Sequence, residues 1–259
     1  MEENVHIVPA GYEIDRIVKP FEGPRGFKAN KVYLLSTVEG TKAPEAIQEQ
    51  HEHYASIVKE RLERLGISVV IVPTNLIDIL EVLNTVSRII LEERAMKNNV
   101  YINMSGAGRL TSVGATLSGM VHGVKVYYVE SDGYADEDPR MKEHGYTLVD
   151  KPKVTVLENF KIILPDGPQL KVLSEINRRG SMRTMDIIDY LIGIKSPGFE
   201  IQGKLSRSPE KNKVIMRANH SILEKLEGMG LVERKRVGRR SEYKVTGSGK
   251  YMVSISGLQ

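Results

Sequence analysis

Residues 100–122, VYINMSGAGRLTSVGATLSGMVH, decide the fold of this chain. An apolar run at 100–102 is followed by a glycine-rich turn at 105–109, and apolar residues then recur at helical spacing. The members of this apolar series are Leu110, Val113, Leu117, Met120 and Val121. The pattern predicts a strand, a turn and a helix. In an open parallel sheet such a turn lies at the carboxyl end of a strand, where a helix N-terminus favours an anion.

The turn is therefore a candidate site for a phosphate-bearing ligand. Gly106 and Gly108 would let a phosphate approach the backbone closely. Ser105 and Thr111 could donate hydrogen bonds, and the guanidinium of Arg109 has a geometry suited to phosphate. The alternative is a turn whose glycines serve close packing alone, because the spacing matches neither the dinucleotide fingerprint nor the phosphate-loop motif. Both interpretations stay open at this point.

Composition limits the class of protein. The 259 residues, of which 41% are hydrophobic, suffice for one large or two ordinary domains with buried cores. No apolar run approaches the roughly 20 residues of a membrane span, and the start MEEN lacks the basic residues of a signal peptide. We therefore expect a cytoplasmic protein. The absence of cysteine excludes disulfides, thiolate catalysis and cysteine zinc sites.

Charge is distributed unevenly along the chain. Residues 1–158 hold 18 Lys and Arg against 23 Asp and Glu, a net charge of −5, whereas the remainder has a net charge of +9. A basic block joined to a mildly acidic one indicates a nucleic-acid-binding domain carried by a sensor or catalytic domain.

The acidic part alternates between strands and helices. Apolar runs at 5–8, 31–36, 67–72, 100–102 and 124–129 predict five strands, and helical periodicity between them covers 12–21, 44–65, 75–96 and the helix after residue 109. This alternation predicts an α/β fold with a Rossmann-like doubly wound sheet. The run at 67–72 is typical of a strand buried on both faces.

The turn after the first strand is expected at the same sheet edge as the glycine-rich turn, although a plain connecting turn is an alternative. It consists of Pro9, Ala10, Gly11 and Tyr12. His51 and His53 point to different sides of their helix, so we expect surface residues and no metal site. The acidic segment 130–138 lacks the ligand spacing of a calcium loop and is interpreted as a solvated loop, from which Tyr134 could stack on a ligand base.

A boundary follows near the turn 165–168, PDGP, with strand-like runs at 154–157 and 162–164 before it. We assign 1–150 to the sensor domain, 151–168 to a connector and 169–259 to a winged helix-turn-helix domain. The last contains helices at 169–179, from Thr184 to 191, and at 211–229, with a long loop at 193–209. Two strands around a basic tip complete the winged-helix order.

This order predicts that the third helix enters the major groove of double-stranded DNA and that wing cations contact phosphates. A solvated basic hairpin or a protein-binding winged helix is the alternative. The expected DNA-binding residues are Lys211, Lys213, Arg217, Asn219, His220, Arg234, Lys235, Arg236, Arg239 and Arg240.

The chain resembles archaeal CRISPR-associated transcription regulators, which join a CARF sensor domain to a winged helix. The resemblance rests on the order of elements, the turn 9–12, the loop 103–109 (NMSGAGR) and the segment 223–243 (LEKLEGMGLVERKRVGRRSEY). The family loop commonly reads Asn-x-Thr-Gly-Gly-Thr-Lys. Asn103, Gly106 and Arg109 fall on its Asn, first Gly and Lys, while Ser105, Ala107 and Gly108 replace Thr, Gly and Thr.

The resemblance implies that two copies of this loop, in a homodimer, bind a cyclic oligoadenylate effector and that the protein is a regulator without a cofactor. A CARF-like regulator of another metabolite is an alternative, as is an enzyme that cleaves the ring or binds a dinucleotide. We expect no enzyme, because no histidine is placed near the loop and no Gly-x-Gly-x-x-Gly opens the first helix.

Overall fold

The computed structural model describes residues 2–135, 138–160, 162–200, 211–238 and 240–258. The chain divides into two compact units, Met1–Ile162 and Ile163–Gln259. Each unit has its own hydrophobic core, so each is described by itself.

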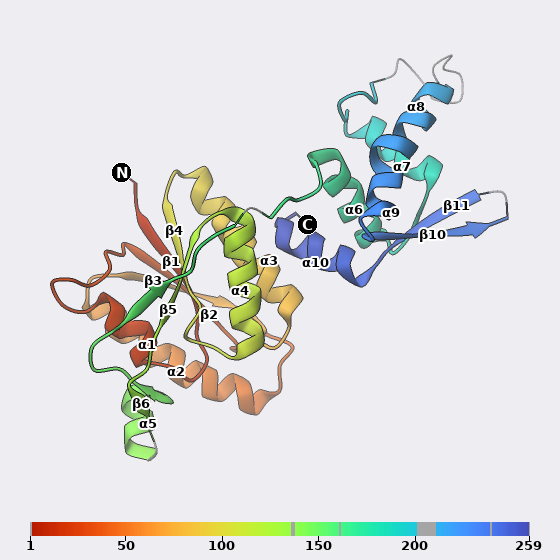
Figure 1. Ribbon diagram of the computed structural model, residues 1–259. Helices are drawn as coiled ribbons and strands as arrows, with labels where there is room; N and C mark the ends of the chain where they lie inside the picture. Colours follow the sequence, from red (N-terminus) through yellow and green to blue (C-terminus); the bar gives the residue numbers. More distant parts are fainter. Residues whose placement is uncertain (1, 136–137, 161, 201–210, 239, 259) are drawn as a thin grey trace. The chain divides into compact units, whose positions relative to one another are not determined.

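The first unit is built on a six-stranded sheet in the order β3-β2-β1-β4-β5-β8 (Figure 1). Its strands are β1 (Asn4–Pro9), β2 (Lys31–Ser36), β3 (Ser68–Pro73), β4 (Asn99–Asn103), β5 (Lys125–Val129) and β8 (Val154–Val156). All pairs are parallel except β5 with β8. Because β1 pairs with both β2 and β4, the strand order reverses there, which confirms the predicted Rossmann-like doubly wound sheet.

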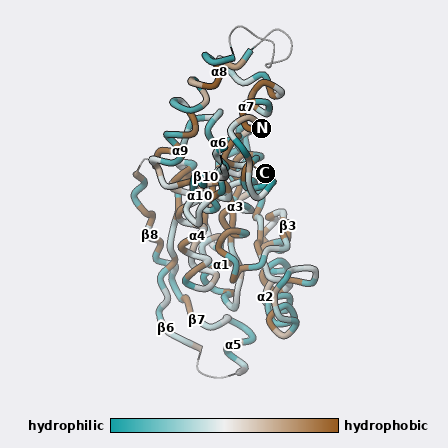
Figure 2. The backbone as a smooth tube through the Cα atoms, turned by 90° about the vertical axis from the view of Figure 1, so that its right-hand side faces the viewer, coloured by the Kyte–Doolittle hydropathy of each residue, from teal (hydrophilic) through white to brown (hydrophobic). Residues whose placement is uncertain are grey.

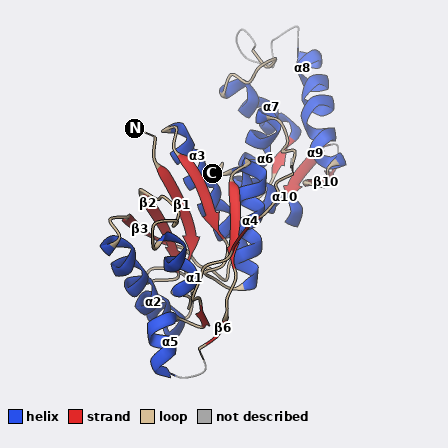
Figure 3. Ribbon diagram, turned by 60° about the vertical axis from the view of Figure 1, so that its left-hand side comes forward, coloured by secondary structure: helices blue, strands red, loops and turns tan. Residues whose placement is uncertain are grey.

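Helices cover both faces of this sheet (Figure 3). One face packs against α3 (Ile79–Ala95) and α4 (Arg109–His122), and the other against α1 (Asp15–Val18), the short 3₁₀ helix η1 (Lys19–Phe21) and α2 (Glu45–Arg64). Hydrophobic and hydrophilic residues are interspersed along α2 (Figure 2), and its buried residues His51, Ala55, Val58 and Leu62 recur every three or four positions, as expected for a helix with one buried side. The hairpin β6 (Gly133–Tyr134) and β7 (Thr147–Leu148) and the helix α5 (Asp138–His144) complete the unit.

Two strand predictions were wrong. The run expected to be buried on both faces is β3, which lies at the edge of the sheet and leaves Val70 41% exposed. Residues 162–164 form no strand. By contrast β8, which lies in the stretch assigned to a connector, adds an antiparallel strand to the sheet.

The buried side of α4 is formed by small residues and not by the apolar series that predicts the helix. Its buried residues are Thr111, Gly114, Ala115, Ser118 and Gly119, whereas Leu110 and Val113 are 48% and 50% exposed. A Cβ atom at Gly119 would overlap the side chain of Val126 and lie 3.0 Å from Ile102 Cδ1, so glycine lets the helix approach the sheet closely. The apolar series of the sequence therefore lies on the outer side of the helix, where Leu110 and Val113 are about half exposed and Leu117, Met120 and Val121 are partly buried.

The second unit has the predicted winged-helix order. It contains α6 (Gly167–Arg179), β9 (Met182–Arg183), α7 (Thr184–Gly193), α8 (Lys211–Ala218), the wing strands β10 (Val232–Val237) and β11 (Arg240–Val245), and α10 (Gly247–Ser256). One π-helical turn, Asn219–Leu223, joins α8 to α9 (Glu224–Gly228). Strand β9 pairs with β11. The prediction that Thr184 caps α7 was wrong, because Thr184 is already helical and the Arg183 N–H donates to Asp186 Oδ2 at 3.1 Å.

Candidate functional site

The two predicted ligand turns meet at the point where the strand order reverses. The Gly11 N–H donates to the Gly106 carbonyl oxygen at 2.7 Å. A Cβ atom at Gly106 would overlap the Pro9 carbonyl oxygen and lie 2.8 Å from Ile17 Cδ1, so only glycine fits between the turns. Gly106 is therefore required for packing. Gly108 has no atom within 4 Å of a Cβ position and an ordinary φ of −61°, so packing does not require glycine there.

A pocket of about 390 Å³ opens beside these turns. Its lining residues are Gly11, Tyr12, Glu13, Ile47, His51, Leu76, Ile77, Gly106, Ala107, Gly108, Thr111 and Tyr146. Six of the predicted ligand residues are thus brought together. Pro9, Ala10, Asn103 and Ser105 are buried and do not line the pocket, and Arg109 is exposed at the first residue of α4.

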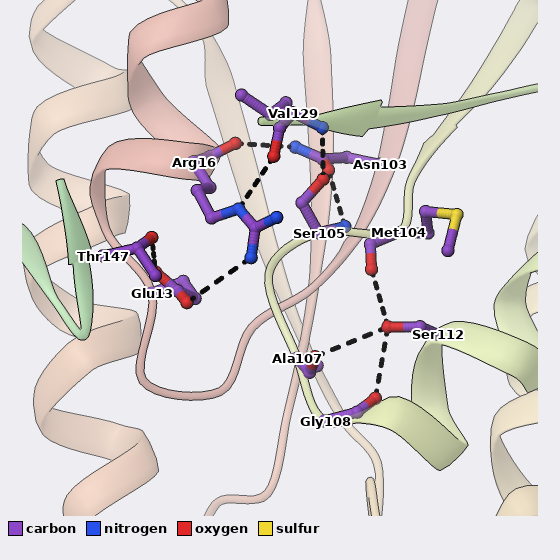
Figure 4. Close-up of polar contacts among 10 residues, drawn as sticks. All are labelled: Glu13, Arg16, Asn103, Met104, Ser105, Ala107, Gly108, Ser112, Val129 and Thr147. Atoms are coloured by element: carbon purple, nitrogen blue, oxygen red, sulfur yellow. Dashed lines mark hydrogen bonds and ion pairs between the residues drawn. The ribbon is translucent and has the colours of Figure 1, made fainter. Parts of the chain in front are cut away.

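Polar side chains predicted to face a ligand instead hold the turn in place (Figure 4). Asn103 Nδ2 donates to the Arg16 carbonyl oxygen at 3.0 Å, and Asn103 Oδ1 accepts from the Ser105 N–H at 2.9 Å. Ser105 Oγ accepts from the Val129 N–H at 2.6 Å. Ser112 Oγ lies 2.7 Å from the Met104 carbonyl oxygen, to which it can donate. The turn is consequently fixed before any ligand arrives.

The glycine-rich turn leads directly into the N-terminus of α4. Its N-cap residue Gly108 makes no side-chain capping bond, and Thr111 in the first turn uses its hydroxyl to donate to the Leu76 carbonyl oxygen at 2.6 Å. The first N–H groups of a helix have no partner within the helix, so they can bind an anion. Arg109 adds a positive charge at this end.

The prediction that His51 is a surface residue was wrong. His51 is only 7% exposed and lies in the pocket wall, whereas His53 is exposed on another side of α2. The argument that no histidine lies near the glycine loop is therefore overturned. Burial lowers the pKa of His51, which favours its neutral form.

Two further pocket residues, Glu13 and Tyr146, were also missed by the sequence analysis. Burial raises the pKa of the Glu13 carboxyl, although the Thr147 hydroxyl donates to Glu13 Oε2 at 2.6 Å and opposes that shift. Tyr146 reaches the pocket because Gly145, at φ +81°, lets the chain lie against Glu13. Tyr134, predicted as a stacking residue, is 72% exposed and does not line this pocket.

The winged-helix unit has a hollow of about 580 Å³ between α7, the π-helical turn and the wing. Its lining residues are Arg183, Thr184, Met185, Asp186, Asn219, Glu224, Arg234, Arg240, Ser241 and Tyr243. Three predicted DNA contacts, Asn219, Arg234 and Arg240, lie in it. Arg183, at the start of α7, adds a cation that the sequence analysis did not include.

Several of the expected DNA-binding side chains are held by neighbours. Arg217 Nη1 donates to the Gly198 carbonyl oxygen at 2.5 Å, and His220 Nδ1 lies 2.7 Å from Glu224 Oε2. Arg234 Nε donates to Ser241 Oγ at 3.0 Å.

Alternation along β10 places Lys235 on the opposite face of the wing from Arg234 and Arg236. Lys211 and Lys213 are exposed on α8. Arg239 and positions 201–209 of the predicted loop lie outside the described residues.

The described residues contain no group of three or more side chains able to hold a metal ion. None of the helices in the described part of the chain has the length and apolar character needed to cross a membrane.

Each of the two units matches a protein-family model. A family model described as HFX_2341-like, N-terminal matches residues 4–134, which is half of the chain. The chain belongs to the HFX_2341-like family. In this member the matched segment contains all five parallel strands and both pocket turns. The DUF6293 C-terminal winged helix domain matches residues 168–257. A search of curated proteins found no match.

Solved structures similar to this family member have low sequence identity. Protein VC1899 from Vibrio cholerae is 11% identical with a TM-score of 0.38, covering 97% of this chain and 64% of that one. Can2 from Sulfobacillus thermosulfidooxidans, in complex with cyclic tetra-adenylate, is 12% identical with a TM-score of 0.40, covering 98% and 62%. Enterococcus italicus Csm6, bound to cyclic hexa-2′-fluoro-hexa-dAMP, is 12% identical with a TM-score of 0.37, covering 54% and 37%. The chain thus spans less than two thirds of each.

Proposed function

We propose that this protein is a ligand-responsive DNA-binding transcription regulator whose sensor unit binds a cyclic oligoadenylate at a homodimer interface. One observation carries the proposal: two glycine turns enclose a 390 Å³ pocket at the reversal point of the sheet, in a chain that also contains a winged helix domain. Ligands of open α/β sheets bind at this point. The CRISPR-associated, archaeal role expected from the resemblance is part of the same proposal.

The pocket suits one nucleotide unit of such a ring. Its volume falls in the range of roughly 300–1,000 Å³ typical of small-molecule sites. The α4 N-terminus and Arg109 supply attraction for a phosphate group. A cyclic oligonucleotide contains several such units, so a second copy of the pocket across a two-fold axis would accommodate the remainder.

The exposed apolar row of α4 supports the homodimer. Leu110 and Val113 are about half exposed, and Leu117 and Met120 are partly buried. Their spacing of three and four residues is that of the contact line between paired helices. Because α4 begins at Arg109, directly after the glycine turn, pairing of two α4 helices would bring two turns toward one axis.

The winged-helix unit would bind double-stranded DNA through α8, the π-helical turn and the wing. Exposed cations on α8 and the wing can contact phosphates, and residues of the helix can reach base edges in the major groove. A symmetric dimer would present two such helices to a palindromic operator.

Calorimetric titration of cyclic tri-, tetra- and hexa-adenylate, NAD and common nucleotides tests the effector. Gly108→Val is expected to weaken binding, because Gly108 lines the pocket and a Cβ atom at this position meets no protein atom within 4 Å. Gly133→Val is the matched control, since Gly133 is also open but lies outside the pocket. Binding of no adenylate ring, or equal binding by the two variants, contradicts the proposed effector site.

Operator binding with and without the ring tests regulation. We expect the ring to change the affinity for operator DNA by about 5- to 150-fold, the usual size of allosteric coupling. Equal affinity in both conditions would show that the sensor does not control the DNA-binding unit.

A second candidate function, cleavage of the bound ring, is favoured by the position of His51 in the pocket wall. A neutral imidazole can accept the proton of a ribose 2′-hydroxyl as its oxygen attacks the adjacent phosphorus. The bond from phosphorus to the 5′-oxygen then breaks, the 5′-oxygen takes a proton from the imidazolium or from water, and a 2′,3′-cyclic phosphate remains. Incubation with labelled cyclic tetra-adenylate separates the two functions. Linear products that disappear in His51→Phe would establish cleavage. An intact ring would mean that the pocket binds the ring without cleaving it.

A further inference from the structure

The imidazole of His51 lies in the pocket wall with an unsatisfied polar atom. Its side chain is 7% exposed, and within the described part of the chain Nδ1 has no hydrogen-bond partner. A buried polar atom without a partner is destabilising. His51 lines the pocket, so its imidazole can hydrogen-bond to a bound molecule with a polar edge.

Two tyrosines form a fixed aromatic wall beside this histidine. The rings of Tyr12 and Tyr146 are stacked with centroids 5.0 Å apart at 12°. The Tyr146 N–H donates to the Tyr12 carbonyl oxygen at 2.9 Å, which fixes the pair through the backbone. Tyr12 also meets the His51 ring edge to face at 4.7 Å and 84°. Their mutual contacts fix the wall and the histidine relative to each other.

The rest of the pocket is mainly apolar, apart from the helix N-terminus at Gly108. Ile47, Leu76 and Ile77 supply aliphatic surface, and the α4 N-terminus beside Gly108 supplies the region that favours an anion. A flat group with apolar faces and a polar edge, joined to a phosphate, satisfies both parts of the pocket. A nucleobase has these properties, whereas a sugar phosphate lacks the flat apolar faces.

We infer that this pocket contains a nucleobase slot, in which a planar base packs against the Tyr12–Tyr146 wall and hydrogen-bonds through its edge to His51. The inference rests on the proposed function, to which it adds recognition of the base. Burial lowers the pKa of His51 and favours the neutral imidazole, so a ring nitrogen that faces the pocket can act as donor or acceptor, depending on the tautomer.

Calorimetric titration of the full chain with cyclic tetra-adenylate, the four ribonucleoside 5′-monophosphates and ribose 5-phosphate tests the slot. At least one monophosphate is expected to bind about tenfold or more tightly than ribose 5-phosphate, which has no base. His51→Phe should weaken binding of the base-bearing probes about tenfold and leave ribose 5-phosphate unchanged. His51→Gln should retain part of the affinity, because its amide still forms hydrogen bonds.

Thermal unfolding without ligand separates recognition from a structural role. His51→Phe is expected to be at least as stable as the wild type, because phenylalanine removes the unsatisfied nitrogen while filling a similar volume. A loss of both stability and affinity would instead mean that the histidine supports the fold, and would overturn its role in the slot.

Two outcomes distinguish this inference from the proposed function. Tight ring binding that His51→Phe leaves unchanged would overturn the slot and leave the effector proposal standing. Binding of a monophosphate that His51→Phe weakens, without any binding of the ring, would support the slot and contradict the cyclic effector. Absence of binding by every base-bearing probe would overturn the slot, while DNA binding by the winged-helix unit is measured separately.

Discussion

Substitution of Gly106 by alanine tests the contact that holds the two pocket turns together. The added Cβ would overlap the Pro9 carbonyl oxygen and lie 2.8 Å from Ile17 Cδ1, and a backbone atom cannot rotate away as a side chain can. Overpacking of this kind costs about 1–3 kcal/mol. Separation of the turns would also break the Gly11 N–H bond to the Gly106 carbonyl oxygen, worth about 0.5–1.5 kcal/mol.

We expect the sensor unit of Gly106→Ala to lose about 3 kcal/mol of unfolding free energy. For a unit of this size that lowers Tm by roughly 6–12 °C, at about 2–4 °C per kcal/mol. Scanning calorimetry of the full chain measures the shift. Hydrogen exchange of the Gly11 amide should also become faster, because its acceptor moves away.

Gly108→Ala is the matched control two residues further along the same turn. An alanine Cβ there meets no atom within 4 Å, and φ −61° with ψ 163° is accessible to alanine. Alanine is a poorer N-cap than glycine, but it also reduces the entropy of the unfolded chain by about 0.4–1 kcal/mol. We expect a net change within about 0.5 kcal/mol. Equal stability of the two variants would refute the contact between the turns.

Three further predictions concern assembly, DNA binding and pH. Val113→Glu places a charge in the exposed row of α4 and should convert the proposed dimer to monomers in sedimentation measurements, whereas a dimer of unchanged affinity would refute the proposed α4 interface. Arg234→Ala should reduce the slope of log K for DNA against log salt by about 0.9, the loss of one phosphate contact, and an unchanged slope would exclude that contact. Burial lowers the pKa of His6 from its ordinary value to about 4, so the unfolded chain takes up a proton at this residue before the folded chain does. The free energy of unfolding is therefore at its full value above about pH 6.5 and decreases as the pH falls toward 4. The loss should approach about 3 kcal/mol, and His6→Phe should flatten this part of the stability profile measured by urea unfolding.

The sheet could be predicted from the sequence because its strands are separate apolar runs, each followed by a recognisable turn. The same logic correctly placed the turns after β1 and β4 at one sheet edge. The sequence pattern did not predict which side of α4 is buried. Periodicity shows that one side of a helix is apolar. In α4, however, the side that carries the small residues Gly114 and Gly119 is the one that packs against α3 and the sheet.

The pocket wall was harder to predict because its members come from distant parts of the chain. His51 lies on a charged helix and Tyr146 follows the acidic segment, and neither has a local pattern that indicates a ligand. Asn103 and Ser105 were read as ligand contacts because they lie within the loop pattern. The structure shows that local backbone groups use these side chains, a distinction that residue type alone does not provide.

The small-residue packing of α4 has a consequence for how members of this family diversify. The interior of the sensor uses Gly114, Ala115, Ser118 and Gly119, so folding places little demand on the opposite side of the helix. Substitutions at Leu110 or Val113 can change the outer surface of the helix while the glycine turn remains intact. After gene duplication, two such proteins could differ in this surface and still keep the same pocket.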